Sequence, residues 1–238
     1  KLKNLGSKLL AGPYVIWMLL FTVIPLGLII YNGFTNSDGR FTFKYVAAIA
    51  DPVNAKPLLL SFEMSLIVTV VCLLLAFPLA VILSKYSTDK NSFIVMIFIL
   101  PMWMNFMLRT LAWRLILLNN GFLNQFLTML GISKVYLMNT KAAIIFGTAY
   151  DYFPFMVLPI YNAVVKIDKD VINAAKDLGA TNSVVLRKII LPLSVPGIVS
   201  GITMVLVPSM SEFVIADMLG GGKIYLIGNA IEQAFNSG

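Results

Sequence analysis

The stretch KIDKDVINAAKDLGATNSVVLRKIILPLSVPG, residues 166–197, predicts two short helices in water between long apolar segments. Asp168 is a favourable N-cap, and Asp170 adds negative charge to the first turn, where the helix dipole stabilises it. Gly179 is expected to end the first helix as a C′ glycine. This hairpin fixes the interpretation of the segments on either side of it.

Both helices of the hairpin carry further signals. Val171, Ala175 and Leu178 fall at helical spacing, so we expect them to form one apolar stripe. Thr181 can cap the second helix, and Pro192 is expected to end that helix or to open the next one.

The hairpin also matches a known pattern. Asn173-Ala174-Ala175, three residues, Gly179, nine residues and Ile189-x-Leu191-Pro192 resemble the E-A-A-x3-G-x9-I-x-L-P loop of ABC importer permeases. Asn173 stands where that family has Glu. In the family this loop is a cytoplasmic coupling helix that docks on the ATP-hydrolysing subunit, a helix-in-groove mode of recognition. The alternative is an ordinary helical hairpin on the membrane surface. The resemblance implies an ATPase-coupling role, within about 166–192, for Asn173, Ala174, Ala175, Asp177, Gly179, Ile189, Leu191 and Pro192.

Composition indicates an all-α integral membrane protein. The chain has 238 residues, of which 59% are hydrophobic and 12% charged, whereas soluble domains carry about 25% charged residues. It has no histidine, which removes the usual general base and the commonest metal ligand. The single cysteine, Cys72, excludes a disulfide framework within the chain. The net charge of +7 fits loops at an anionic membrane surface better than nucleic acid.

Hydropathy predicts five spans, and the resemblance implies that they belong to a single permease domain, 1–238. Basic residues before the first span place the N-terminus in the cytoplasm, and the hairpin then lies on the same side. Residues 110–140 are interpreted as outside helices lying against the bundle. The permeases that the chain resembles finish with a further span, which we expect to be missing from this sequence. The predicted spans are 9–31, 58–83, 92–108, 142–165 and 193 to about 215.

Carboxylates within the spans are candidate substrate-path residues. Glu63, Asp151 and Glu212 lie in spans that contain no Lys or Arg as drawn, and Asp217 follows the last span. Unpaired acids at membrane depth are costly and favour a pathway for a cation. Glu212 follows Pro208, where we expect the helix to break. Aromatic faces attract ammonium groups, which adds four candidates to the path: Trp103, Tyr150, Tyr152 and Tyr161.

Five of these candidates also have a purely structural interpretation. Asp151 can be a hydrogen-bonded core residue, Glu63 an interface residue, Asp217 a loop cap, Trp103 a belt aromatic, and Tyr161 simple core packing.

Two further stretches narrow the resemblance. LPMWMNFMLRTLAW, residues 100–113, and VPSMSEFVIADMLGGGKIYLIGNAI, residues 207–231, look like the B-type permease subunits of spermidine/putrescine ABC importers, within the binding-protein-dependent, MetI-like permease family. This resemblance implies a MetI-like fold in a bacterial cytoplasmic membrane. It also implies a second permease of similar fold, two ATP-binding subunits that hold ATP and Mg, and an extracytoplasmic polyamine-binding protein.

Other functions stay open at this point. The same machine could import ferric iron or sulfate, although an anion site should have basic residues at depth. A membrane-embedded aspartyl enzyme would need Asp151 with Glu212, and neither lies in a catalytic motif. A stand-alone channel or scaffold would leave the coupling loop without a purpose. The sequence has no GxxxxGK[ST] motif, so we expect the chain not to hydrolyse ATP.

Overall fold

The computed structural model describes residues 12–36, 38–86 and 100–237. The chain separates into two compact units, Lys1–Lys56 and Pro57–Gly238, which are described in turn. Helices form nearly all regular structure in the described residues, where the sole extended pairing is an isolated bridge between Thr35 and Phe41. The all-α prediction is confirmed.

The first unit is dominated by an apolar helix that spans Gly12–Gly33 and includes the π-helical turn η1, Leu19–Val23, and α2, Ile24–Gly33. No residue of α2 is buried within the first unit, and the helix is apolar all round, as a membrane span is. The predicted first span is confirmed over its described part, while the basic residues before it lie outside the described residues. Two short helices follow, α3 at Lys44–Ala47 and η2 at Ala48–Ala50.

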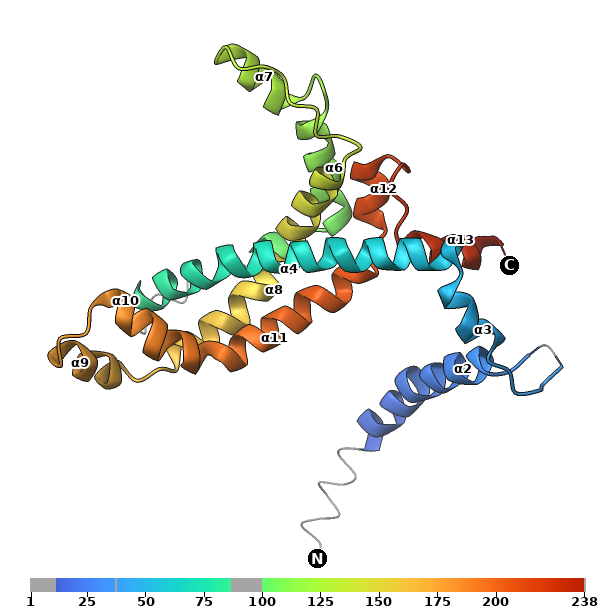
Figure 1. The fold of residues 1–238 in the computed structure, drawn as a ribbon, viewed down its shortest axis with the longest axis horizontal. Coiled ribbons are helices and arrows are strands. Elements are labelled where there is room, and N and C mark those ends of the chain that lie inside the picture. The colour runs from blue at the N-terminus through green and yellow to red at the C-terminus, as the bar shows by residue number, and fades with distance from the viewer. Residues whose placement is uncertain (1–11, 37, 87–99, 238) are drawn as a thin grey trace, which may run out of the picture. The chain divides into compact units, whose positions relative to one another are not determined.

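The second unit is built on three long helices. Figure 1 shows α4, Pro52–Tyr86, running beside α8, Lys141–Val165, and α11, Leu191–Met210. The helix α4 exceeds its predicted span at both ends, because hydropathy marks the apolar part of a helix and not its polar extensions. The three helices enclose a core formed by Val68, Cys72, Ala76, Ala80, Met156, Val157, Ile160 and Val205.

Small residues allow α11 to lie directly on α8. A Cβ atom added to Gly197 would lie 2.5 Å from the Pro159 carbonyl oxygen, and one on Gly201 would lie 2.8 Å from the Met156 sulfur. These glycines are four positions apart, the small-xxx-small spacing with which membrane helices approach closely.

Contrary to the prediction, Pro192 does not interrupt the helix. The helix α10, Asn182–Val185, passes through the π-helical turn η4, Leu186–Ile190, into α11, so that Asn182–Met210 is one continuous helix. A proline lacks the N–H for the i−4 bond and crowds the carbonyl there, and the wider π turn just before Pro192 accommodates both effects.

Further helices of the second unit are shorter. They are η3, Leu100–Trp103; α6, Phe106–Leu117; α7, Phe122–Met129; α12, Val214–Gly220; and α13, Ile227–Ser237. Both α6 and α12 contact α8 and each other. The predicted boundary after residue 108 is wrong, since α6 runs through it from an Asn105 cap that accepts the Met107 N–H at 2.9 Å. Part of the predicted third span, 92–99, lies outside the described residues.

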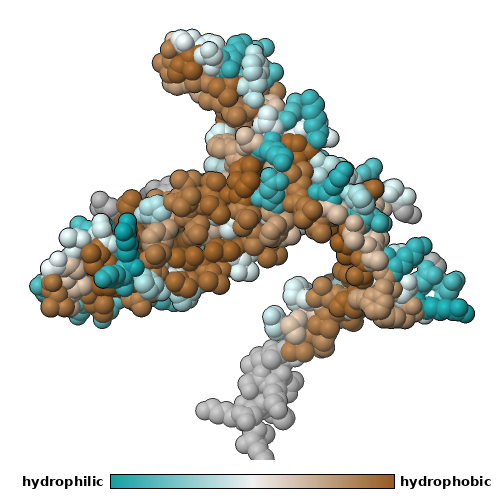
Figure 2. Space-filling view, viewed as in Figure 1, coloured by the Kyte–Doolittle hydropathy of each residue, from teal (hydrophilic) through white to brown (hydrophobic). Residues whose placement is uncertain are grey.

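Four helices within the described residues are long and apolar enough to span a membrane: Gly12–Gly33, Pro52–Lys85, Lys141–Val165 and Asn182–Met210. Figure 2 shows the apolar surface along the α4–α8–α11 body, with polar groups at the end formed by α10 and α9, Lys169–Asp177. This distribution is the one expected where spans leave the apolar layer.

Candidate functional site

A buried ion pair lies between α6 and α8. Nη2 of Arg109 is 3.2 Å from Oδ1 of Asp151, and both side chains are only 9% exposed. The Thr110 hydroxyl donates to Oδ2 of Asp151 at 3.4 Å, and the Arg109 guanidinium lies 6.0 Å from the centre of the Tyr150 ring. The prediction that Asp151 is unpaired is therefore wrong, because its basic partner Arg109 lies on a helix that the sequence analysis divided between the end of a span and the outside helices.

Glu212 lies at the break between α11 and α12. The helix α11 ends at Met210 and α12 begins at Val214, with three residues between them, so the predicted break is confirmed. Oε1 of Glu212 accepts the Ile215 N–H at 3.2 Å and thereby caps α12. Its other oxygen accepts the Tyr152 hydroxyl at 3.2 Å, which ties the break to α8.

These groups form one polar cluster, defined here as Arg109, Thr110, Tyr150, Asp151, Tyr152 and Glu212. Glu212 bonds Tyr152, the residue that follows Asp151 on α8, so both carboxylates belong to the same region. With one guanidinium, which pairs with Asp151, the cluster carries an excess of negative charge when all three groups are ionised. Nε and Nη1 of Arg109 have no hydrogen-bond partner among the described residues, so the guanidinium retains donors for other groups.

The sequence analysis missed Arg109 and Thr110 as members of the cluster. The signal in the sequence was Asn105, a favourable N-cap. It starts α6 about one turn before Arg109 and so places Arg109 and Thr110 on that helix. Arg114, on the same helix, is exposed and does not join them.

The other predicted path residues lie elsewhere. Asp217 accepts the Asn229 side-chain amide at 2.7 Å and braces α12 against α13. Glu63 is half exposed and pairs with Lys141 at 3.6 Å, so it too has a basic partner that was not predicted. Trp103 is 75% exposed, and Tyr161 belongs to the hydrophobic core.

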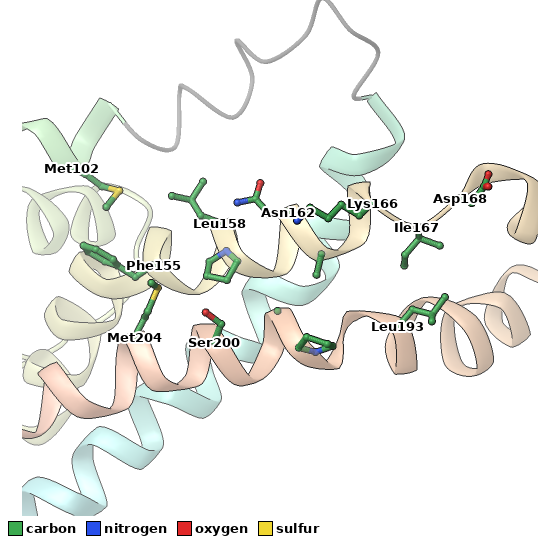
Figure 3. Close-up of a pocket in the computed structure, with 14 residues that line it drawn as sticks. Met102, Phe155, Leu158, Asn162, Lys166, Ile167, Asp168, Leu193, Ser200 and Met204 are labelled. Carbon is green, nitrogen blue, oxygen red and sulfur yellow. The ribbon is translucent and has the colours of Figure 1, made fainter. Parts of the chain in front are cut away.

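A groove of about 780 Å³ runs along the contact between the C-terminal half of α8 and the N-terminal half of α11 (Figure 3). Its walls are largely apolar, with Phe155, Met102 and Met204 toward one end and Lys166 and Asp168 toward the other. The predicted path residues do not line it. Two helices from different parts of the sequence form this groove, so no local pattern signals it.

The hairpin has the caps predicted for it. Asp168 accepts the Asp170 N–H at 2.9 Å, and Gly179 adopts φ +82° after α9. The Gly179 N–H donates to Lys176 and the Ala180 N–H to Ala175, which is a Schellman motif. Thr181 occupies the next N-cap position, but its side chain makes no capping bond.

The predicted apolar stripe of α9 is divided between two faces. Ala175 packs with Ile172 against the core, whereas Val171 and Leu178 are 47% and 90% exposed. Residues four apart are offset by only about 40° around a helix, so the edge of the buried face falls between residues 171 and 175. The other predicted coupling residues Asn173, Ala174, Asp177, Leu191 and Pro192 are exposed, and Ile189 is half-buried.

Metal ligands do not gather in this region. In residues 12–36, 38–86 and 100–237, no three His, Cys, Asp or Glu side chains are grouped so that they could hold a metal ion. The site is one of ion pairs and hydrogen bonds.

Known proteins match the chain along most of its length. Residues 13–237 match the family described as binding-protein-dependent transport system inner membrane component. The chain belongs to this family. A spermidine/putrescine transport system permease protein PotB of Salmonella typhimurium is 37% identical over 92% of this chain and 79% of its own length. A protein of the same name from Haemophilus influenzae is 34% identical over 98% of this chain and 85% of its own.

A solved structure supports the fold of the inner membrane component. A chain of a bacterial alginate ABC transporter, crystallised in complex with an alginate pentasaccharide-bound periplasmic protein, superposes with a TM-score of 0.65. It is 19% identical and covers 98% of this chain and 83% of the solved one. The chain is thus a multi-pass membrane permease subunit with a MetI-like fold, and not an enzyme.

Proposed function

We propose that this inner membrane component is the B-type permease of a polyamine ABC importer and that the polar cluster forms part of its substrate path. The observation that carries the proposal is the convergence of Asp151 and Glu212 at a helix break, beside the aromatic rings of Tyr150 and Tyr152. The similarity to permeases named for spermidine and putrescine supports the same cargo.

The cluster has the chemistry to hold an amine briefly. A carboxylate pair attracts ammonium groups, and a tyrosine face adds about 0.5–2 kcal/mol for a cation. Arg109 already forms an ion pair with Asp151 at 3.2 Å, so an arriving ammonium group must compete with the protein's own guanidinium. Competition of this kind keeps the site weak, which suits a path that must release its cargo. Glu63, Trp103, Asp217 and Tyr161 stay candidates for a path role.

We place the hairpin and the N-terminus in the cytoplasm. The exposed apolar groups of α9, Val171, Ala174 and Leu178, recur at helical spacing and offer a face for a partner groove. This face is proposed to dock on an ATP-binding subunit, with the residues of the E-A-A-type loop in their coupling roles. The complete importer is then this chain, a second permease of similar fold, two subunits that bind ATP and Mg, and an extracytoplasmic binding protein, with one domain, 1–238, contributed by this chain.

An anion such as sulfate is the second candidate cargo. The observation that favours it is Arg109, a buried cation with two nitrogen atoms that lack partners among the described residues. The two carboxylates nearby oppose an anion, so the amine is preferred.

Uptake into vesicles tests the cargo. The importer is reconstituted with ATP inside, and uptake of radiolabelled spermidine, putrescine, sulfate and ferric iron is measured with the binding protein outside. The proposal expects saturable, ATP-dependent uptake of a polyamine. Uptake of sulfate or iron, without polyamine uptake, would contradict it.

A further inference from the structure

A second cavity, of about 660 Å³, lies where the hairpin meets the ends of α4 and α8. Its cationic groups are Lys85 of α4 together with Lys169 and Lys176 of α9. No acidic residue lines it, and none of the three lysines forms an ion pair within the described part of the chain. Among the described residues, the cavity therefore concentrates positive charge that no acidic side chain in its lining neutralises.

One face of α9 supplies most of this charge. Lys169, Ile172, Asn173 and Lys176 follow the i, i+3, i+4, i+7 spacing, and all four line the cavity. Asp170 and Asp177 lie on other faces of the helix and do not line it. Asn173 is the neutral residue between two lysines, where a carboxylate would pair with them.

The cavity lies at the boundary of the apolar layer. Lys85 is the last residue of the candidate span Pro52–Lys85, and Val165, also in the lining, is the last of Lys141–Val165. Beneath the lysines the lining turns apolar, with Val81, Val164 and Ile190. A cationic rim over an apolar floor at the end of two spans matches the phosphate and glycerol region of a phospholipid.

We propose that this cavity binds the headgroup of an anionic phospholipid, with its phosphate held by Lys85, Lys169 and Lys176. Bound there, the lipid joins the ends of α4 and α8 to the inward face of α9, while the apolar groups on the outward face stay free. The inference needs the chain to be a membrane permease but does not depend on which cargo it carries.

Lipid binding to the intact importer tests the proposal. The detergent-purified complex is titrated with dioleoyl phosphatidylglycerol or dioleoyl phosphatidylcholine, and bound lipid is counted by native mass spectrometry. Wild type is expected to retain phosphatidylglycerol selectively. Each lysine near an anionic surface is worth about 1 kcal/mol, so Lys169→Gln/Lys176→Gln should weaken binding by roughly fivefold per lysine.

Matched variants separate the cavity from general surface charge. Arg187→Gln/Lys188→Gln removes the same charge from exposed residues outside the lining and should leave binding unchanged. Asn173→Glu removes no lysine but adds a carboxylate to the cavity, and it should weaken binding as well. Lys85→Gln tests the contribution of α4. Equal losses in cavity and control variants, or binding that does not distinguish the two lipids, would overturn the proposal.

Inorganic phosphate distinguishes the source of the anion. A lipid site with an apolar floor should keep phosphatidylglycerol when millimolar phosphate is added. Displacement of the lipid by free phosphate would show that the cavity recognises a soluble anion instead, which would also overturn the proposal.

Discussion

Arg109 and Asp151, on α6 and α8, meet at 3.2 Å in a part of the protein where each side chain is 9% exposed. Taking both charges out of water is costly, and the pair is not saturated by hydrogen bonds from other described residues. A pair of this kind gives little net stability, yet it makes each partner depend on the other. It therefore has the properties of a group that can be displaced during transport.

The interdependence of this pair can be measured by a double-mutant cycle. Arg109→Gln and Asp151→Asn each leave an uncompensated buried charge, which costs about 3–5 kcal/mol. The double variant removes both charges, so its unfolding temperature in detergent should exceed that of either single variant. If the loss in the double variant equals the sum of the two single losses, the charges are not coupled.

The hydrogen bond from Tyr152 to Glu212 predicts a transport phenotype. Tyr152→Phe keeps the ring but removes the donor at 3.2 Å, so the helix break should lose its tie to α8 and spermidine uptake should fall about tenfold, since a hydrogen bond to a charged group is worth about 1.5–3 kcal/mol. Tyr225→Phe makes the same change at an exposed hydroxyl that bonds Gln233. Uptake that responds equally to both substitutions would argue against a role for the break.

The close contact between α8 and α11 predicts that a larger residue at Gly197 lowers stability. Gly197→Ala puts a methyl group 2.5 Å from the Pro159 carbonyl oxygen, and this overpacking should cost about 1–3 kcal/mol of stability. Gly27→Ala is the matched control, because no atom lies within 4 Å of its added Cβ. Thermal unfolding of the two variants checks the prediction, and equal stability would mean that the helices can separate without cost.

A substitution on the exposed face of α9 is predicted to weaken assembly with an ATP-binding subunit without destabilising the fold. Leu178 is 90% exposed, so Leu178→Ser should change stability by no more than about 0.5 kcal/mol. If the face docks on an ATP-binding subunit, the same change should weaken that association about tenfold, as truncation of an anchor residue does. Met129→Ser, at an 84% exposed residue of α7, is the control in a pull-down assay. Unchanged association in Leu178→Ser would exclude this face as the docking surface.

Local signals in the sequence were sufficient for much of this fold. Apolar length predicted α4 and α8, the Asp168 cap and Gly179 predicted both ends of α9, and Pro208 with Glu212 predicted the helix break. These features depend on neighbouring residues, which a sequence displays directly.

What the sequence did not reveal depends on contacts between distant segments. The partners of Asp151 and Glu63 come from other helices or helix ends, so counting charges within each span missed Arg109 and Lys141. The continuation of the helix through Pro192 depends on a π turn that no residue type requires. The two faces of α9 became distinct only when the hairpin packed against the bundle.

The most direct test of the proposed path is the apparent KM for spermidine in ATP-driven uptake by vesicles that contain the reconstituted importer, wild type beside Glu212→Gln. The glutamine can still accept the Tyr152 hydroxyl but removes one negative charge from the cluster. We predict a KM at least about tenfold higher, with the ATP-binding subunits still bound, since a charge-assisted contact is worth about 1.5–3 kcal/mol. An unchanged KM in the assembled importer would contradict the assignment of the cluster to the substrate path.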